Sequence, residues 1–448
     1  MKKIAVAIYL IVIFLPQIQS QAQEILQSGP MVGYSAMREA GLWVQTKQPA
    51  KVKIAFWNIK EPKKVYYTNE VNTKREEGNT AKLTAENLEP GQIYNYSLLI
   101  NGRKVSLPYE LKFQTQKLWQ YRTEPPKFTF AAGSCFYVNE AEYDRAGKGY
   151  GSDYEIVKSI YEKHPDLMIW LGDNWYYREA DWDSWSGMLS RITHTRALPE
   201  LQPLLGSVHH YSIWDDHDFG PNDSDRGFWN KYKTLEAFKL FIPNPSFGIN
   251  GKPGITSFFQ WGDTDFFLLD NRFYRTPNAR KTDDGRTVLG EEQIQWLIDN
   301  LVTSKAPFKV VVMGGQLLNP VQKSYLETYS IFPEEKEKIL SLIKKEKIEG
   351  VIFITGDRHH SELTKLDRNE DYPIYEFTIS SLTAGVAAGK DEENVLRVPG
   401  TVTDEHNYAI FTVDGARKNR SLLCTVYNVK GEKLWEYKIN EQELKYKK

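Results

Sequence analysis

Four short polar segments contain the residue types that bind metal ions in hydrolases. Each directly follows an apolar run with the length and composition of a buried strand. They are Gly133-Ser134-Cys135, Gly172-Asp173-Asn174-Trp175-Tyr176, Trp214-Asp215-Asp216-His217-Asp218 and Gly356-Asp357-Arg358-His359-His360. Ligand sites in α/β proteins collect at the carboxyl ends of strands, so we expect the four segments to meet. Singly, each has a structural explanation as core filler, turn or surface; together they favour a metal site.

The chemistry that uses such a set is hydrolysis with two metal ions. It needs one carboxylate that bridges the ions and further ligands on either side. Asp173 suits the bridge because Gly172 allows a tight turn before it, and Tyr176 can reach back to the same ion. A Cys thiolate with a Tyr phenolate favours Fe(III) or Zn, whereas oxygen ligands alone favour Ca, Mg or Mn. The residue types therefore predict two unlike metals.

The elements that must position these segments alternate between strands and helices. Buried strands are expected at 128–132, 167–171, 211–214, 265–269, 309–313 and 350–354, and helices at 154–163, 229–241, 291–302 and 334–345. From residue 374 the pattern is again mainly β and completes the same domain. The alternation predicts an α/β domain over 122–448, with helices covering the faces of its sheets.

Residues 23–121 show a different, all-β pattern. Runs such as 40–46 and 50–57 alternate apolar and polar residues, and a Pro90-Gly91 turn precedes a Tyr-rich strand. This is typical of a small fibronectin-like or immunoglobulin-like sandwich. The segment offers no cluster of acids, bases or metal ligands, and the prolines around residue 125 suit a linker to the next domain.

Charge and targeting signals limit the classes of partner. The formal net charge of −1 argues against a nucleic-acid surface or an anionic membrane as the main partner. Residues 1–22 have the form of a secretory signal peptide: Lys2 and Lys3, an apolar run over 4–15, and a small-x-small site at Ser20-Gln21-Ala22. An N-terminal membrane anchor is the alternative. No later window is apolar enough to span a membrane, so we expect an exported protein, periplasmic or secreted.

The two cysteines, Cys135 and Cys424, differ in context. Cys135 ends a strand within a polar segment, whereas Cys424 lies in an alternating run that predicts a buried strand. We expect Cys135 to be a metal ligand and Cys424 to be core, and their separation in sequence leaves a disulfide open as the alternative.

The order of the four segments, with Trp214-Asp215-Asp216-His217-Asp218-Phe219 as the most specific, resembles the PhoD-like alkaline phosphatases of the calcineurin-like metallophosphoesterase superfamily. The resemblance covers residue 128 to the C-terminus, and a β-sandwich like that of 23–121 is usual before it. The implied fold is a two-sheet α/β sandwich flanked by helices, with metals at the carboxyl ends of the sheets.

The resemblance also implies roles for individual residues. One ion, expected to be Fe(III), is surrounded by Cys135, Asp173, Tyr176 and His359. Asp173 bridges to a second ion, expected to be Ca, which Asp216 and Asp357 also bind; Zn, Mn and Mg stay open. His217 contacts the phosphoryl group and assists the leaving oxygen.

The neighbours of these residues have alternative interpretations. Asp218 either binds a further divalent ion or orients His217. Arg272, Arg275 and Arg358 either clamp phosphate oxygens, Arg272 as a catalytic residue, or form salt bridges to the Asp-rich loop. His360 is expected behind the ligands or at the surface, Asn174 and Trp175 shape the substrate site, and His209 and His210 are expected to be structural.

The function that follows is an exported, metal-dependent phosphoester hydrolase in which a metal-bound hydroxide attacks phosphorus in line. Phosphomonoesters, phosphodiesters, nucleotides or phospholipid head groups all fit as substrates. The main alternative is a phosphodiesterase or phospholipase D-like enzyme, since loops such as 142–153 and 384–401 leave the choice of ester open. A second alternative is an inactive exported binding protein whose sandwich holds a glycan.

Overall fold

The computed structural model describes residues 22–282, 285–369 and 371–447. The expected signal peptide lies almost wholly outside these residues. Within them, no helix is both long and apolar enough to cross a membrane. The chain forms two compact units. Unit 1 extends to Leu118 and also contains Arg196–His209 and Leu240–Pro243, and unit 2 contains the remainder.

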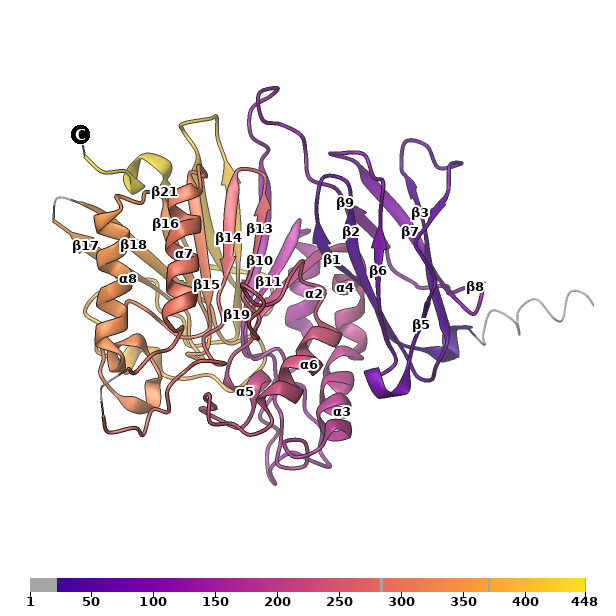
Figure 1. Cartoon of the computed structure of the whole chain (residues 1–448), viewed down its shortest axis with the longest axis horizontal. Coiled ribbons are helices and arrows are strands. Elements are labelled where there is room, and N and C mark those ends of the chain that lie inside the picture. Colours follow the sequence, from indigo (N-terminus) through magenta and orange to yellow (C-terminus); the bar gives the residue numbers. More distant parts are fainter. Residues whose placement is uncertain (1–21, 283–284, 370, 448) are drawn as a thin grey trace, which may run out of the picture. The chain divides into compact units, whose positions relative to one another are not determined.

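Unit 1 is built from two antiparallel groups of strands (Figure 1). In the first, β2 pairs with both β1 and β6, and in the second, β3 pairs with β7. Its core is a continuous cluster of aliphatic and aromatic side chains from both groups. The strands are β1 Leu26–Ser35, β2 Ala40–Thr46, β3 Lys51–Asn58, β4 Tyr66–Tyr67, β5 Val71–Asn72, β6 Thr80–Ala85, β7 Ile93–Ile100, β8 Arg103–Lys104 and β9 Lys112–Gln114. The N-terminal all-β region expected from the alternating pattern is confirmed.

Unit 2 contains two sheets that pack against each other. The first has the order β21-β20-β19-β10-β11-β12 and the second β13-β14-β15-β16-β18-β17. Aromatic pairs such as Phe130 with Phe266 and Phe411 with Phe377, with ring centroids 5.3 Å apart, join the two inner faces. The strands are β10 Phe128–Gly133, β11 Leu167–Leu171, β12 His209–Ile213, β13 Ser257–Trp261, β14 Thr264–Leu268, β15 Phe308–Met313, β16 Val351–Thr355, β17 Glu362–Arg368, β18 Asp371–Thr378, β19 Asn407–Asp414, β20 Ser421–Asn428 and β21 Lys433–Asn440.

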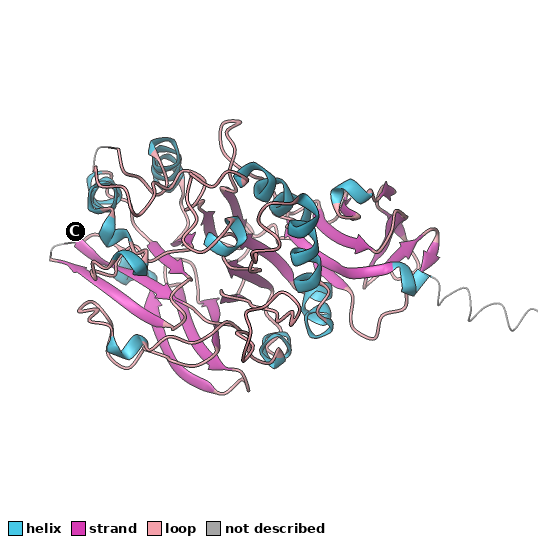
Figure 2. Cartoon of the chain, turned by 90° about the horizontal axis from the view of Figure 1, so that it is seen from below, coloured by secondary structure: helices cyan, strands magenta, loops and turns pink. Residues whose placement is uncertain are grey.

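Helices lie beside these sheets, as Figure 2 shows by secondary structure, and α7 and α8 run along the second sheet in Figure 1. These helices are α2 Glu155–Glu162, α3 Trp185–Arg196, α5 Asp216–Phe219, α6 Lys231–Phe241, α7 Glu291–Thr303 and α8 Pro333–Lys345, whereas α4 Gln202–Ser207 belongs to unit 1. The expected α/β class and two-sheet architecture are confirmed. The apolar pattern did not predict α3, whose polar and apolar residues are weakly segregated.

The parallel strands determine where the candidate metal ligands lie. β10 pairs in parallel with β11, and β15 with β16. Within each pair the carboxyl ends therefore lie at the same edge of the sheet, and three of the four polar segments directly follow β10, β11 and β16. Cys424 is buried in β20 and both cysteines are free thiols, so the alternative disulfide is absent from the structure.

Candidate metal centre

Four of the expected ligands share an uncommon backbone conformation. Cys135, Asp173, Asp357 and His359 have φ values of 59°, 52°, 68° and 57°, in the left-handed region. For residues other than glycine this conformation costs on the order of 1–2 kcal/mol each, and it turns the chain sharply. All four lie just past the carboxyl ends of β10, β11 and β16. Strain concentrated in this way marks a functional site, because packing alone gives no reason to accept it.

The first group of donors joins a soft ligand with oxygen and nitrogen ligands. Ligand atoms of Cys135, Asp173 and His359 all lie within 4.8 Å of one another. Cys135 Sγ is 3.5 Å from Asp173 Oδ2, and the Tyr176 hydroxyl donates to the same Oδ2 at 3.0 Å. Thus the structure brings together all four residues expected around the first ion.

Side chains behind this group fix its orientation. Ser380 Oγ donates to Cys135 Sγ at 3.1 Å and accepts the backbone N–H of His359 at 3.0 Å. His359 Nδ1 contacts the carbonyl oxygen of Gly385. That contact assigns the proton to Nδ1 and leaves Nε2 as the donor for a metal ion.

The second group of donors consists of oxygen ligands only. Carboxylate atoms of Asp215, Asp216 and Asp357 lie within 4.8 Å of one another. Three buried oxygens nearby, Asp215 Oδ2, Asp216 Oδ1 and Asn271 Oδ1, have no hydrogen-bond partner among the described residues. Buried oxygens are rarely left unpaired because each costs about 1–3 kcal/mol. A hard cation such as Ca would satisfy them, so the residues present fit that group.

Asp173 connects the two groups. It also clusters with Asp216 and His217, and Asp173 Oδ1 accepts the backbone N–H of His217 at 3.3 Å. One carboxylate that reaches both donor sets is the arrangement a bridging ligand requires. The His217 ring packs on Tyr176 with centroids 4.2 Å apart, and its Nε2 is 3.8 Å from Asp216 Oδ2.

The electrostatics of the bare donors also favour a cation. Burial and the nearby charge of Asp216 raise the pKa of Asp173 well above its ordinary value. Burial and Asp357 raise the pKa of the Cys135 thiol to about 12, and burial and Asp215 raise the pKa of Asp357 to about 7. Concentrated buried negative charge disfavours ionisation, and bound cations reverse this.

The three arginines considered as phosphate clamps all form ion pairs. Arg272 is fully buried; it contacts Asp215, and its Nη1 lies 2.7 Å from Glu327 Oε2. Arg275 Nη2 lies 3.2 Å from Glu327 Oε1, and Arg358 Nη2 donates to Glu392 at 2.6 Å. Arg272 thus forms the expected alternative, a salt bridge to the Asp-rich loop, whereas Arg275 and Arg358 pair with carboxylates from other segments. Phosphate binding by these residues stays a prediction.

The remaining sequence candidates serve the fold in the structure. Asp218 accepts the backbone N–H groups of Asn174 and Asp215 at 2.7 and 2.9 Å, which caps α5. Both ring nitrogens of His209 contact backbone atoms, and His210 Nδ1 accepts from Trp170 at 3.0 Å. Asp218 belongs to none of the donor clusters among the described residues, so its role as a further metal ligand stays a prediction.

Sequence reasoning missed several contributors. Asp215 was seen only as part of its motif, and Asn271 and Glu327 were not singled out at all. A signal for the site existed in Gly314, since a Cβ there would lie 2.5 Å from Asp215 Cγ. Glu327 also has a left-handed φ of 52°, but it comes from a loop with no periodic pattern.

His360 belongs to a separate buried network around Glu362. Its Nε2 lies 3.8 Å from Glu362 Oε2, and Glu362 also contacts Arg397. Burial would raise the pKa of Glu362, but His360 and Arg397 lower it to about 2, against an ordinary value of 4.5. The ionised carboxylate therefore stabilises the fold above about pH 4.5, and that contribution is lost as pH falls toward 2.

We therefore expect Glu362→Gln to reduce the acid sensitivity of the protein. The free energy of unfolding of the wild type should fall by about 3 kcal/mol more than that of Glu362→Gln between pH 4.5 and 2. Urea titrations at a series of pH values measure this, with Glu393→Gln at an exposed neighbouring position as control. Parallel curves for wild type and Glu362→Gln would contradict it.

Comparison with known proteins gives the following matches. A family model described as PhoD-like phosphatase matches residues 130–419, and one described as a domain of unknown function (DUF7800) matches residues 23–118. Alkaline phosphatase D of Bacillus subtilis (strain 168) is 25% identical over 354 residues. That alignment covers 67% of this chain and 58% of the relative, so the chain spans less than two thirds of the relative's length.

Two solved structures share the fold. A structure of PhoD superposes with a TM-score of 0.75 at 20% identity, covering 93% of this chain and 92% of the other. A purple acid phosphatase from yellow lupin (Lupinus luteus) seeds superposes with a TM-score of 0.66 at 13% identity, covering 93% and 75%. The two-sheet architecture is thus that of known phosphatases.

Proposed function

Because the chain belongs to the PhoD-like phosphatase family, we propose that it hydrolyses phosphoesters with the help of two or more bound metal ions. The observation that carries the proposal is the pair of donor groups that Asp173 connects, since it belongs to the first group and clusters with Asp216 of the second. Buried unpaired oxygens beside a thiol, phenol and imidazole set are costly to the fold unless cations occupy the site.

The two donor groups would hold different ions. Cys135, Tyr176 and His359, with Asp173, suit Fe(III), and Zn is the alternative. Asp216 and Asp357 suit Ca, with Mn or Mg as alternatives, and we add Asp215 and Asn271 to this side because their free oxygens lie there. When bound, such ions would supply Lewis-acid activation of water and of the phosphoryl oxygens.

His217 is the residue we assign to the leaving group. Burial lowers its pKa to about 4, so the ring is neutral near pH 7 and carries one N–H group that can donate a hydrogen bond. The negative charge of a bound phosphoester would raise the pKa of the His217 ring and so favour its protonated form. The side chain keeps 15% of its surface exposed, unlike Arg272, which keeps none.

Arg178 is a cation near the His217 ring, and its charge helps to lower the pKa of that ring. Two of its nitrogens, Nε and Nη2, donate to the Tyr137 hydroxyl at 2.9 and 2.7 Å, and Tyr137 in turn donates to Asp144. These contacts hold the guanidinium over the Tyr137 ring. We assign it to the attraction of the substrate anion, with Arg272 and Arg275 holding the acidic side chains in place.

The domain and targeting assignments belong to the same proposal. We assign residues 122–448 to the catalytic domain, 23–121 to an accessory β-sandwich, and 1–22 to a signal peptide that exports the protein. The support is the change of pattern near residue 122 and the charged, apolar and small-residue order of the first segment.

Two chromogenic substrates test the activity. Protein purified without chelator should hydrolyse p-nitrophenyl phosphate faster than bis-p-nitrophenyl phosphate, because Arg178 and His217 add positive charge or donors for a dianion. Elemental analysis of the same preparation should find iron or zinc together with a harder divalent ion. Faster diester turnover would favour the phosphodiesterase alternative, and absence of both turnover and metal would favour an inactive binding protein.

A further inference from the structure

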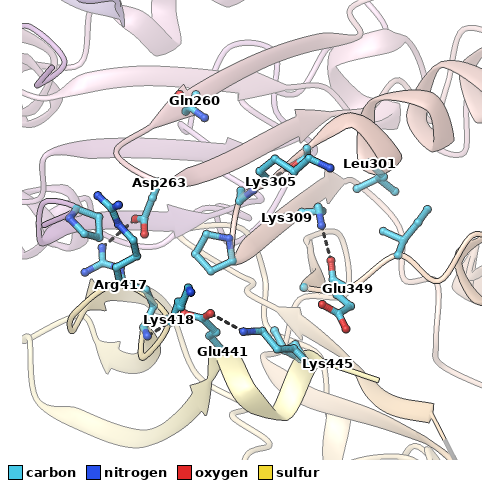
Figure 3. A pocket seen from close by; sticks show the side chains of 18 of the residues that line it. Gln260, Asp263, Leu301, Lys305, Lys309, Glu349, Arg417, Lys418, Glu441 and Lys445 are labelled. Atoms are coloured by element: carbon cyan, nitrogen blue, oxygen red, sulfur yellow. Dashed lines mark hydrogen bonds and ion pairs between the residues drawn. The ribbon is translucent and has the colours of Figure 1, made fainter. Parts of the chain in front are cut away.

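Unit 2 contains a cavity that the metal centre does not use (Figure 3). Its volume is about 670 Å³, within the range of roughly 300–1,000 Å³ that small-molecule sites occupy. Its walls come from the segments that precede β15 and β16, from the β13–β14 and β19–β20 turns, and from η6 Glu441–Leu444.

The cavity lies at the opposite end of the sheet from the metal centre. Pro307 and Glu349 precede the amino ends of β15 and β16, whereas Asp357 follows the carboxyl end of β16. Strands of this length separate their two ends by roughly 15–20 Å at about 3.3 Å per residue. A ligand in the cavity therefore cannot be a substrate held by the metal donors.

The cavity is positively charged although the whole chain carries −1. Seven basic and four acidic side chains line it. Two of the acids are already neutralised, because Asp263 pairs with Arg420 at 2.9 Å and Glu441 with Lys445 at 2.7 Å. Lys305, Lys347 and Lys418 are exposed and have no ion-pair partner within the described parts of the chain. The excess charge would attract an anion.

Lys309 is the most informative of these residues. Its side chain is only 6% exposed, and its ammonium donates to the backbone oxygen of Glu349 at 2.6 Å (Figure 3). An ammonium has three N–H groups, so two are left for other acceptors. The nearby Asp265 carboxylate already accepts from Gln260 and Ser304. The charges of Asp265 and Glu349 act on this ammonium, but its two remaining N–H groups can still take an anionic ligand.

Arg420 is a second buried cation with an unused hydrogen-bond donor. It is 1% exposed, and its Nη atoms donate to Asp263 and to the backbone oxygens of Gly415 and Pro126. Its Nε is buried without a hydrogen-bond partner among the residues described. Two buried cationic side chains from different walls thus both retain unused donors.

The rim of the cavity offers aromatic surface. Tyr121 is 97% exposed, and Trp119 beside it packs against the Arg417 guanidinium, 5.6 Å from the ring centroid. The exposed Tyr121 and the half-buried Trp119 next to a cationic cavity suit a ligand that joins a flat ring to an anionic group. We propose that this cavity binds a small organic anion, with a phosphate or carboxylate held by Lys309 and its basic neighbours and a ring against Trp119 and Tyr121.

Calorimetry on the full-length, metal-loaded protein tests the proposal. The probes are a non-hydrolysable phosphonate analogue of AMP and isophthalate, with neutral adenosine as the uncharged comparison. Lys309→Met and the double variant Lys305→Ala/Lys418→Ala should each weaken binding of the charged probes by about tenfold or more, because each removes charged donors. Lys345→Met, an exposed lysine outside the cavity, should bind as the wild type does.

A second readout separates the cavity from the metal centre. The phosphonate also competes with p-nitrophenyl phosphate, and that inhibition constant should be equal in wild type and in all three variants. The proposal is overturned if the calorimetric Kd of the phosphonate equals its inhibition constant in the wild type and in all three variants. It is also overturned if adenosine binds as tightly as the phosphonate, or if both cavity variants bind both charged probes as tightly as the wild type does. Binding of either charged probe that is lost in the folded double variant supports it.

Discussion

Replacing Asp173 with Asn should abolish phosphoester hydrolysis and deplete bound metal while the protein stays folded. Asp173 lies in the first donor group and also clusters with Asp216 of the second group, so its carboxylate would be the shared ligand of two ions. An amide keeps the shape but loses the charge that offsets two cations. Losing one electrostatic contact in an active site costs about 10²–10³-fold in kcat, and loss of the bridge should cost at least that. Turnover of p-nitrophenyl phosphate and the metal content per chain measure the effect.

The control for this variant is Asp299→Asn, the same substitution at an exposed position of α7. It should keep wild-type turnover and metal content. Circular dichroism and thermal unfolding should show that Asp173→Asn retains its fold, because the amide keeps the shape of the side chain and burial disfavours the charged carboxylate that it replaces. Normal turnover in a purified Asp173→Asn protein would mean that Asp173 does not bridge.

Features with a local sequence pattern could be predicted. Strand β16 is a continuous apolar run, and the polar residues that follow it have no place in a core. The same contrast marks the ends of β10 and β11, so the donors of the first group could be predicted from sequence. Their left-handed backbone could not be predicted, because only the folded surroundings of Cys135 or His359 stabilise it.

Features that depend on contacts between distant segments have no local sequence pattern, so they could not be predicted. Residues 196–209 and 240–243 belong to unit 1 although they lie far along the chain, because their contacts are with strands such as β1 and β2. Glu327 reaches Arg272 from 55 residues away and from a loop. The choice between a salt bridge and a phosphate clamp for Arg272 therefore rested on tertiary structure.

Arg272→Met should lower the free energy of unfolding of unit 2 by about 3–5 kcal/mol, the usual cost of breaking a buried ion pair from one side. The Arg272 guanidinium is fully buried, contacts Asp215 and Glu327, and lies 3.8 Å from Asp216. Without it, these buried carboxylates lose their shared positive partner. Chemical denaturation of the metal-loaded protein measures the loss.

The same variant decides between the two roles of Arg272. Arg280→Met, an exposed arginine eight residues further along, is the matched control and should change stability by less than about 1 kcal/mol. If Arg272 is a structural partner of the acidic ligands, stability and metal affinity fall together, and excess divalent cation partly restores both. If instead Arg272→Met were as stable as Arg280→Met and raised only KM, the guanidinium would act directly on the phosphate.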